Sequence, residues 1–169
     1  MSQRWFLLVS AAVYTAAWWL AVLWQGEGLI WLCLLLLVHF ALSPTRLKDF
    51  RLLPLALIGM TMDTLLMYAG VYEFSAMPVW LMLLWLHFLL AMGHCIAWLG
   101  KQPIWVQVFT GVFGGAGSYI AGAELGAVAM PLGNLLTFLL IAPLWGTIIP
   151  GFFWLQQRLP GNGDYLSWR

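Results

Sequence analysis

The basic residues of this 169-residue chain all fall on one side of its apolar segments, which restricts how those segments can cross a membrane. They precede the first apolar run or follow the second, fourth and sixth: Arg4, Arg46, Lys48, Arg51, Lys101, Arg158 and Arg169. The three other connections carry Glu27, Glu73 and Glu124 and no basic residue. Because Lys and Arg collect in cytoplasmic loops, the pattern predicts six membrane-spanning helices with both termini in the cytoplasm.

The composition supports a membrane protein and excludes an ordinary soluble domain. The chain is 63% hydrophobic and only 8% charged, whereas about a quarter of the residues in a soluble domain are charged. Its net charge of +1 comes from basic residues scattered over short loops, which form no patch for nucleic acid. The expected partners are therefore membrane lipids and a small apolar ligand. A monomer and a homo-oligomer both remain open.

The apolar runs set the expected helices, because a hydrocarbon core of about 30 Å needs about 20 apolar residues. The predicted spans are Trp5–Trp24, Gly28–Ser43, Arg51–Val71, Met77–Leu99, Ile104–Leu125 and Pro131–Leu155. The short link Gln25–Glu27 predicts an antiparallel hairpin of the first two spans. We expect residues 1–159 to form a single all-α six-helix bundle and residues 160–169 to form a flexible cytoplasmic tail.

Two spans carry residues that are unusual in a plain apolar helix. The fifth contains a run of glycines, which lets helices approach closely in lipid, and we favour this packing role over exposure of backbone to a ligand. These glycines are Gly111, Gly114, Gly115, Gly117 and Gly122. Pro143 and Pro150 predict a kinked sixth helix.

A buried acid and a buried histidine are the strongest candidates for chemistry. Asp63 and His87 each lie 12 residues from the predicted cytoplasmic ends of their helices, a depth of about 18 Å. An acid near the bilayer centre must face the bundle interior or a water-filled cavity. The equal depth on neighbouring antiparallel helices predicts a carboxylate–imidazole pair of Asp63 with His87.

Further polar and aromatic residues extend this pair into a candidate ligand site. His94 follows His87 by seven residues, two turns along the same helix face, and His39 is expected at a similar depth. The predicted ligand-binding residues are Trp85, His94, Ser118, Tyr119, His39 and Asn134.

Three interpretations of this site stay open. The Asp63–His87 pair can fix helix register, or it can relay protons in a small transporter. It can also act in an intramembrane enzyme, with His87 as base and Asp63 as the acid that orients it. The sequence does not decide whether the protein is an enzyme.

No metal or cofactor is expected from the spacing of the candidate ligands. His87 and His94 lie too far apart along one helix to chelate one ion. Three scattered histidines without a Cys-rich or carboxylate-rich spacing are not typical of a zinc site. The glycine run lacks a preceding strand and a phosphate-loop lysine, and no nucleophile elbow surrounds Ser118.

One stretch of the chain resembles a bacterial membrane family. It runs from Gly59 to Phe74 (GMTMDTLLMYAGVYEF) and is followed by Pro78-Val79-Trp80, Leu84-Trp85 and Gly114-Gly-Ala-Gly-Ser-Tyr119. Together these motifs resemble the family catalogued as domain of unknown function 2878. The resemblance implies a bacterial inner-membrane protein with no established role, and it marks Asp63, Trp85 and Tyr119 as motif positions. Where the family pattern has a proline before the Ser-Tyr pair, this chain has Gly117.

A second likeness is architectural. Six spans in a short chain, with Ala12, Ala16, Ala17 and Ala21 on the first span, are similar to the substrate-binding subunits of energy-coupling-factor vitamin transporters. Those subunits usually have a longer first extracellular loop than Gln25–Glu27.

The expected function follows from the buried polar pair and its aromatic surroundings. We expect a protein that binds or modifies a small apolar or lipid-like molecule in an intramembrane cavity around Asp63 and His87, with Tyr68 and Trp145 adding aromatic surface. The alternatives are a solute or vitamin transporter subunit that uses Asp63 for coupling, and a scaffold without chemistry.

Overall fold

The computed structural model describes residues 3–74 and 77–159 and is all-helical. Helices account for 83% of the described residues, which contain no strand. A single isolated bridge joins the backbone of Glu73 to that of Ala129, with 3.0 Å between the Glu73 nitrogen and the Ala129 oxygen. The all-α fold class is therefore confirmed. The predicted tail at 160–169 lies outside the described residues.

The chain divides into two compact units. Unit 1 contains residues 1–62 and 77–97, and unit 2 contains residues 63–76 and 98–169. Helix α4 (Ala56–Tyr68) passes from the first unit into the second. The prediction of a single bundle concerns the arrangement of the two units together and stays a prediction.

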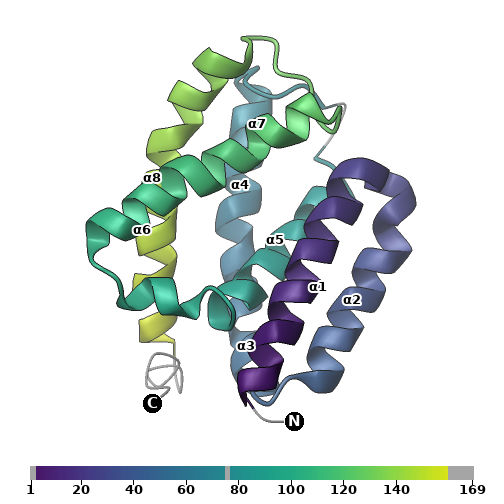
Figure 1. Ribbon diagram of the computed structural model, residues 1–169. Helices are drawn as coiled ribbons and strands as arrows, with labels where there is room; N and C mark the ends of the chain where they lie inside the picture. Colours follow the sequence, from purple (N-terminus) through teal and green to yellow (C-terminus); the bar gives the residue numbers. More distant parts are fainter. Residues whose placement is uncertain (1–2, 75–76, 160–169) are drawn as a thin grey trace. The chain divides into compact units, whose positions relative to one another are not determined.

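Unit 1 begins with the predicted antiparallel hairpin (Figure 1). Helix α1 (Gln3–Trp24) and helix α2 (Leu29–Leu42) are joined by the 3-10 turn η1 (Gln25–Gly28). A Cβ on Gly28 would lie 3.0 Å from the backbone oxygen of Leu20, so glycine allows the turn to close tightly. The hairpin prediction is confirmed.

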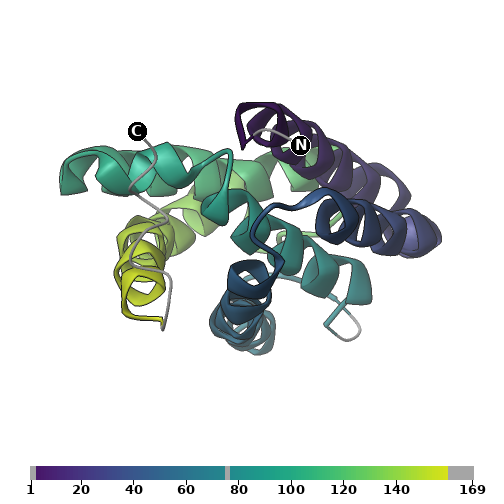
Figure 2. The ribbon, with the colours of Figure 1, turned by 90° about the horizontal axis from the view of Figure 1, so that it is seen from below.

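Helix α5 (Val79–Gly93) forms the core of unit 1. It packs against both helices of the α1–α2 hairpin (Figures 1 and 2). Ten of its residues are buried: Trp80, Leu81, Trp85, His87, Phe88, Leu89, Leu90, Ala91, Met92 and Gly93. Burial of two thirds of the helix fits a sequence that is apolar without a polar face.

The end of α5 corrects one predicted boundary. The fourth span was expected to continue to Leu99, but the helix ends at Gly93. His94 has φ −133° and ψ −93°, which no α-helix accommodates, and the 3-10 turn η3 (Ala97–Lys101) follows. His94 is therefore not on the helix face of His87. Hydropathy did not reveal this boundary, because the residues from Cys95 to Leu99 are also apolar.

The start of the third span also differs from the prediction. Helix α3 (Arg46–Leu52) begins five residues before the predicted Arg51, within the basic segment that the sequence predicts to be a loop. The short turn η2 (Leu53–Leu55), which contains Pro54, connects α3 to α4. A helix in this segment brings Asp49 into the interior of unit 1, where it is fully buried.

Unit 2 contains the glycine-rich segment and the last helix. Helix α6 (Ile104–Thr110), the π-helix η4 (Gly111–Ala116) and helix α7 (Gly117–Glu124) follow one another without a break. Helix α8 (Asn134–Arg158) begins after Gly133, whose φ of +74° favours glycine, and it continues through Pro143 and Pro150.

The glycines of η4 bring it into close contact with α8. A Cβ on Gly111 would lie 2.2 Å from the backbone oxygen of Trp145, and a Cβ on Gly115 would lie 2.1 Å from the Trp145 ring. Neither distance leaves room for a side chain. The predicted packing role of the glycine run is therefore confirmed at Gly111 and Gly115.

Within residues 3–74 and 77–159, four stretches are long and apolar enough to cross a membrane. They are Trp5–Leu42, which contains the α1–α2 hairpin, Arg46–Tyr68, Ile104–Glu124 and Asn134–Arg158. The apolar helix Val79–Gly93 is shorter. The chain thus has the helix lengths and composition of an integral membrane protein.

Candidate functional site

The first candidate site lies in unit 2 around Asp63, which α4 carries. This carboxylate is 1% exposed. The Tyr119 hydroxyl, from α7, donates to it and lies 3.0 Å from Oδ1 and 2.8 Å from Oδ2. The structure thus brings together two of the predicted site residues. A hydrogen bond to a charged acceptor in a buried setting is stronger than one between neutral groups.

A second tyrosine completes this group, which we call the Asp63 cluster (Asp63, Tyr72 and Tyr119). Tyr72 follows the turn at Gly70, whose φ is +73°. Its ring stacks on that of Tyr119, with centroids 5.3 Å apart and planes at 17°. Its hydroxyl is buried and makes no hydrogen bond to any residue that the structure describes. Burial, and then the negative charge of Asp63, raise the pKa of Tyr72, so the phenol stays neutral.

Sequence reasoning missed Tyr72. It lies within the Gly59–Phe74 motif, but it was read as part of a loop because it follows the third span. The turn after α4 folds back and buries the tyrosine, which is 1% exposed. Its position within this motif was the sequence feature that could have identified Tyr72 as a site residue.

Trp145 supports the other side of Tyr119. Their ring centroids are 5.8 Å apart. The Trp145 ring in turn lies directly against Gly115 of η4. The glycine-rich π-helix therefore sets the position of the indole that contacts Tyr119. Such π-helical turns occur frequently at functional sites.

His87 contacts a backbone carbonyl group within unit 1. Its Nε2 lies 3.1 Å from the backbone oxygen of Leu32, within unit 1. The predicted pairing with Asp63 joins residues of the two units and stays a prediction. Trp85, also predicted, is buried in unit 1, and its ring lies so close to Gly59 that a Cβ there would be 2.4 Å away.

The remaining predicted residues of unit 2 make local contacts. The Ser118 hydroxyl donates to the Gly115 oxygen at 2.7 Å. The Asn134 side chain donates to Glu124. Asn134 also lines an open groove of about 350 Å³ with Phe113, Gly117, Ile120, Leu135 and Phe138.

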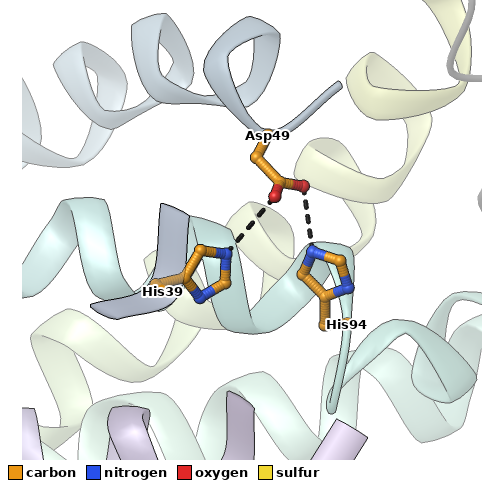
Figure 3. Close-up of side chains that lie close together, drawn as sticks. All are labelled: His39, Asp49 and His94. Carbon is orange, nitrogen blue, oxygen red and sulfur yellow. Dashed lines mark hydrogen bonds and ion pairs between the residues drawn. The ribbon is translucent and has the colours of Figure 1, made fainter. Parts of the chain in front are cut away.

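The second candidate site lies in unit 1 and joins the two other histidines to an acid (Figure 3). We call it the His–Asp–His cluster (His39, Asp49 and His94). His94 Nε2 is 2.9 Å from Asp49 Oδ1, and His39 Nε2 is 3.4 Å from Asp49 Oδ2. His39 comes from the last turn of α2, Asp49 from α3, and His94 from the residue after α5. All three side chains are buried.

Two hydroxyl groups fix the orientation of the Asp49 carboxylate. Ser43 donates to Oδ2, and Thr45 donates to Oδ1 over 3.2 Å. The Thr45 backbone N–H donates in turn to the Ser43 hydroxyl at 3.1 Å. The segment between α2 and α3 thus acts as a small cradle for the carboxylate.

An aromatic ring from α1 covers the two imidazoles. The Phe6 ring lies edge-on to His39 and His94, with centroid distances of 5.2 Å and 4.6 Å. Phe6 is 1% exposed. The cluster is therefore enclosed by apolar surface on this side.

The sequence predicts a similar depth for His39 and His94, but Asp49 is not among the predicted site residues. Asp49 is the only acid in the basic segment from Arg46 to Arg51, and that was the available signal. The basic segment was assigned to a cytoplasmic loop, where an acid is expected to face water. Because α3 forms there, the carboxylate turns inward instead.

Comparison with known proteins identifies a family whose model matches most of this chain. A search of curated proteins and a search of solved structures found nothing similar to this chain. The model of one protein family, described as a protein of unknown function (DUF2878), matches residues 7–151. The matched region contains the motif residues Asp63, Trp85 and Tyr119 as well as both clusters. The chain therefore belongs to the DUF2878 family.

Proposed function

We propose that this protein binds a small, mostly apolar or lipid-like molecule in unit 2, and that the Asp63 cluster recognises the polar group of that molecule. We further propose that it is a multi-pass protein of the bacterial inner membrane, with six spans and cytoplasmic termini. The distribution of Lys and Arg supports this topology.

The observation that carries the proposal is the Tyr72 hydroxyl. It is buried and makes no hydrogen bond to any described residue. Leaving such a group unsatisfied costs about 1–3 kcal/mol, and native proteins rarely keep that cost without a reason. A ligand with one hydrogen-bonding group removes the cost when it binds beside Tyr72.

The surroundings of Tyr72 indicate what kind of molecule fits. The stacked rings of Tyr72 and Tyr119 and the indole of Trp145 offer apolar surface to a hydrocarbon or ring system. The Asp63 carboxylate accepts hydrogen bonds, so it favours a ligand that presents a donor such as a hydroxyl or an amine. An apolar site with a few convergent polar groups is typical of small-molecule recognition.

The test is mass spectrometry of the molecules that the purified protein retains in a mild detergent. Wild type is compared with Asp63→Asn, which removes the charge at nearly constant volume. Thr147→Val is the matched control, because the Thr147 hydroxyl binds the Leu144 backbone oxygen on the exposed side of α8. We expect one species to be enriched by wild type and by the control, and to fall at least tenfold in Asp63→Asn.

Other outcomes decide against the proposal. If folded wild type enriches no small molecule, and Asp63→Asn unfolds, Asp63 has a structural role and the protein is a scaffold. If wild type and Asp63→Asn retain the same species equally, ligand binding does not depend on the Asp63 cluster. Retention of a polar solute together with a cytoplasmic partner protein would favour the transporter alternative instead.

A further inference from the structure

The His–Asp–His cluster in unit 1 has the composition of a transition-metal site. It offers two imidazole nitrogens and one carboxylate, and one ligand atom from each residue lies within 4.8 Å of the others. Two histidines with one carboxylate recur in catalytic zinc sites and in mononuclear non-haem iron sites. Ca²⁺ and Mg²⁺ prefer oxygen ligands and do not suit two imidazoles.

The distances within the cluster also suit an ion. Ligand atoms 2.0–2.2 Å from a tetrahedral ion lie about 3.4 Å from one another. His39 Nε2 and Asp49 Oδ2 are 3.4 Å apart, and His94 Nε2 is 2.9 Å from Oδ1. The first distance matches this separation. The second is the length of a hydrogen bond, which coordination of an ion by His94 would replace.

Hydrogen bonding alone leaves part of the cluster unexplained. His39 Nε2 is buried and makes no hydrogen bond to any residue in the described part of the chain. It is directed at Asp49, yet at 3.4 Å it is only a loose contact (Figure 3). A metal ion would occupy the lone pair of this nitrogen.

The surroundings resemble the support that metal ligands usually have. Ser43 and Thr45 hold the carboxylate from behind, as hydrogen bonds in the outer shell of a metal site do. Phe6 covers both imidazoles and limits access of water. The ligands come from α2, α3 and the end of α5, so one ion would join three elements of unit 1.

We propose that His39, Asp49 and His94 bind one divalent first-row transition-metal ion, with Zn²⁺ as the probe. Three protein ligands leave a fourth position for water or another small ligand, as in catalytic rather than purely structural sites. This site lies in unit 1 and does not depend on ligand binding by the Asp63 cluster in unit 2.

The experiment is a Zn²⁺ titration of the full-length protein after treatment with a chelator, in detergent, against a competing fluorescent indicator. We expect wild type to bind one Zn²⁺ per chain. His94→Gln and Asp49→Asn should weaken binding at least tenfold. His87→Gln is the matched control, because His87 is equally buried in unit 1 but contacts the Leu32 backbone oxygen. It should bind Zn²⁺ as wild type does.

Two further measurements keep the test decisive if a ligand variant does not fold. Co²⁺ added to wild type should give the visible absorption bands of a four-coordinate site. Ser43→Ala, which leaves all three ligands in place, should weaken Zn²⁺ binding by about 10–100-fold. Folded wild type that shows neither saturable Zn²⁺ binding nor Co²⁺ bands would overturn the proposal. The cluster would then be a hydrogen-bonded support for α3.

Discussion

At the residue scale, the two stacked tyrosines of the Asp63 cluster are chemically alike but have opposite energetic roles. The Tyr119 hydroxyl donates to both oxygens of Asp63. The Tyr72 hydroxyl has no hydrogen-bond partner among the described residues. Removing the first hydroxyl breaks a charge-assisted hydrogen bond, whereas removing the second relieves an unsatisfied buried group.

Removing the hydroxyl group from each tyrosine is therefore expected to change the free energy of unfolding in opposite directions. In protein stripped of retained molecules, Tyr72→Phe should raise the free energy of unfolding by about 1–3 kcal/mol, and Tyr119→Phe should lower it by a similar amount. Thermal or chemical unfolding in one detergent measures both changes. If Tyr72→Phe is as destabilising as Tyr119→Phe, the Tyr72 hydroxyl has a structural partner and our account of the ligand site is wrong.

Single residues were only partly predictable from the sequence. Asp63 was identifiable because an acid in an apolar run is rare, and its interior position follows from that cost alone. Asp49 was not predicted as a site residue, because its basic neighbours are typical of a cytoplasmic loop. The contact of His39 with His94 depends on where α2 and α5 end, and sequence periodicity locates helix ends poorly.

At the scale of elements, the contact between η4 and α8 determines the geometry of the Asp63 cluster. Gly111 and Gly115 face Trp145, and Trp145 lies against Tyr119. Gly114, between them, is different: a Cβ there would lie 3.7 Å from the nearest atom, a Thr110 methyl group. These three glycines of one short helix can therefore be compared directly, because two of them lie against Trp145 and one does not.

Alanine substitutions should separate these glycines by position. Gly111→Ala should be destabilising by about 1–3 kcal/mol or more, because its Cβ meets a backbone carbonyl that cannot move aside as a side chain would. Gly115→Ala should displace the Trp145 ring and reduce ligand retention as well as stability. Gly114→Ala should be neutral or stabilising by about 0.5–1 kcal/mol, since alanine suits a helix better than glycine. Thermal unfolding of the three variants in one detergent tests the order. Equal effects at Gly111 and Gly114 would show that the η4–α8 contact is not tight.

The elements themselves were largely predictable, because their physical cause is local. Apolar length located α1, α2 and α8 to within a few residues. Pro78 and Pro103 immediately precede α5 and α6, where a proline costs no helix hydrogen bond. The early end of α5 and the helix α3 were not predicted. Asp49 and His94 contact each other at these two places, and hydropathy carries no information about such a tertiary contact.

At the scale of the whole molecule, the distribution of Lys and Arg predicts the topology of the chain in the membrane. In a variant with Cys33 and Cys95 replaced by serine, a cysteine introduced at Glu27 should react with a membrane-impermeant maleimide in intact spheroplasts. A cysteine introduced at Lys101 should react only after the membrane is opened. Its reaction after opening is the control that shows this cysteine to be reactive. Labelling of the Lys101 position in intact spheroplasts would contradict the predicted orientation.

The central claim is that the Asp63 cluster binds one small molecule through Tyr72. Native mass spectrometry of the intact protein, released from detergent, tests it most directly because it counts bound molecules. The account predicts that wild type carries one adduct of defined mass per chain, and that Tyr72→Phe, although at least as stable, loses it. A folded wild type without an adduct, or a Tyr72→Phe variant with the same adduct, would contradict the claim.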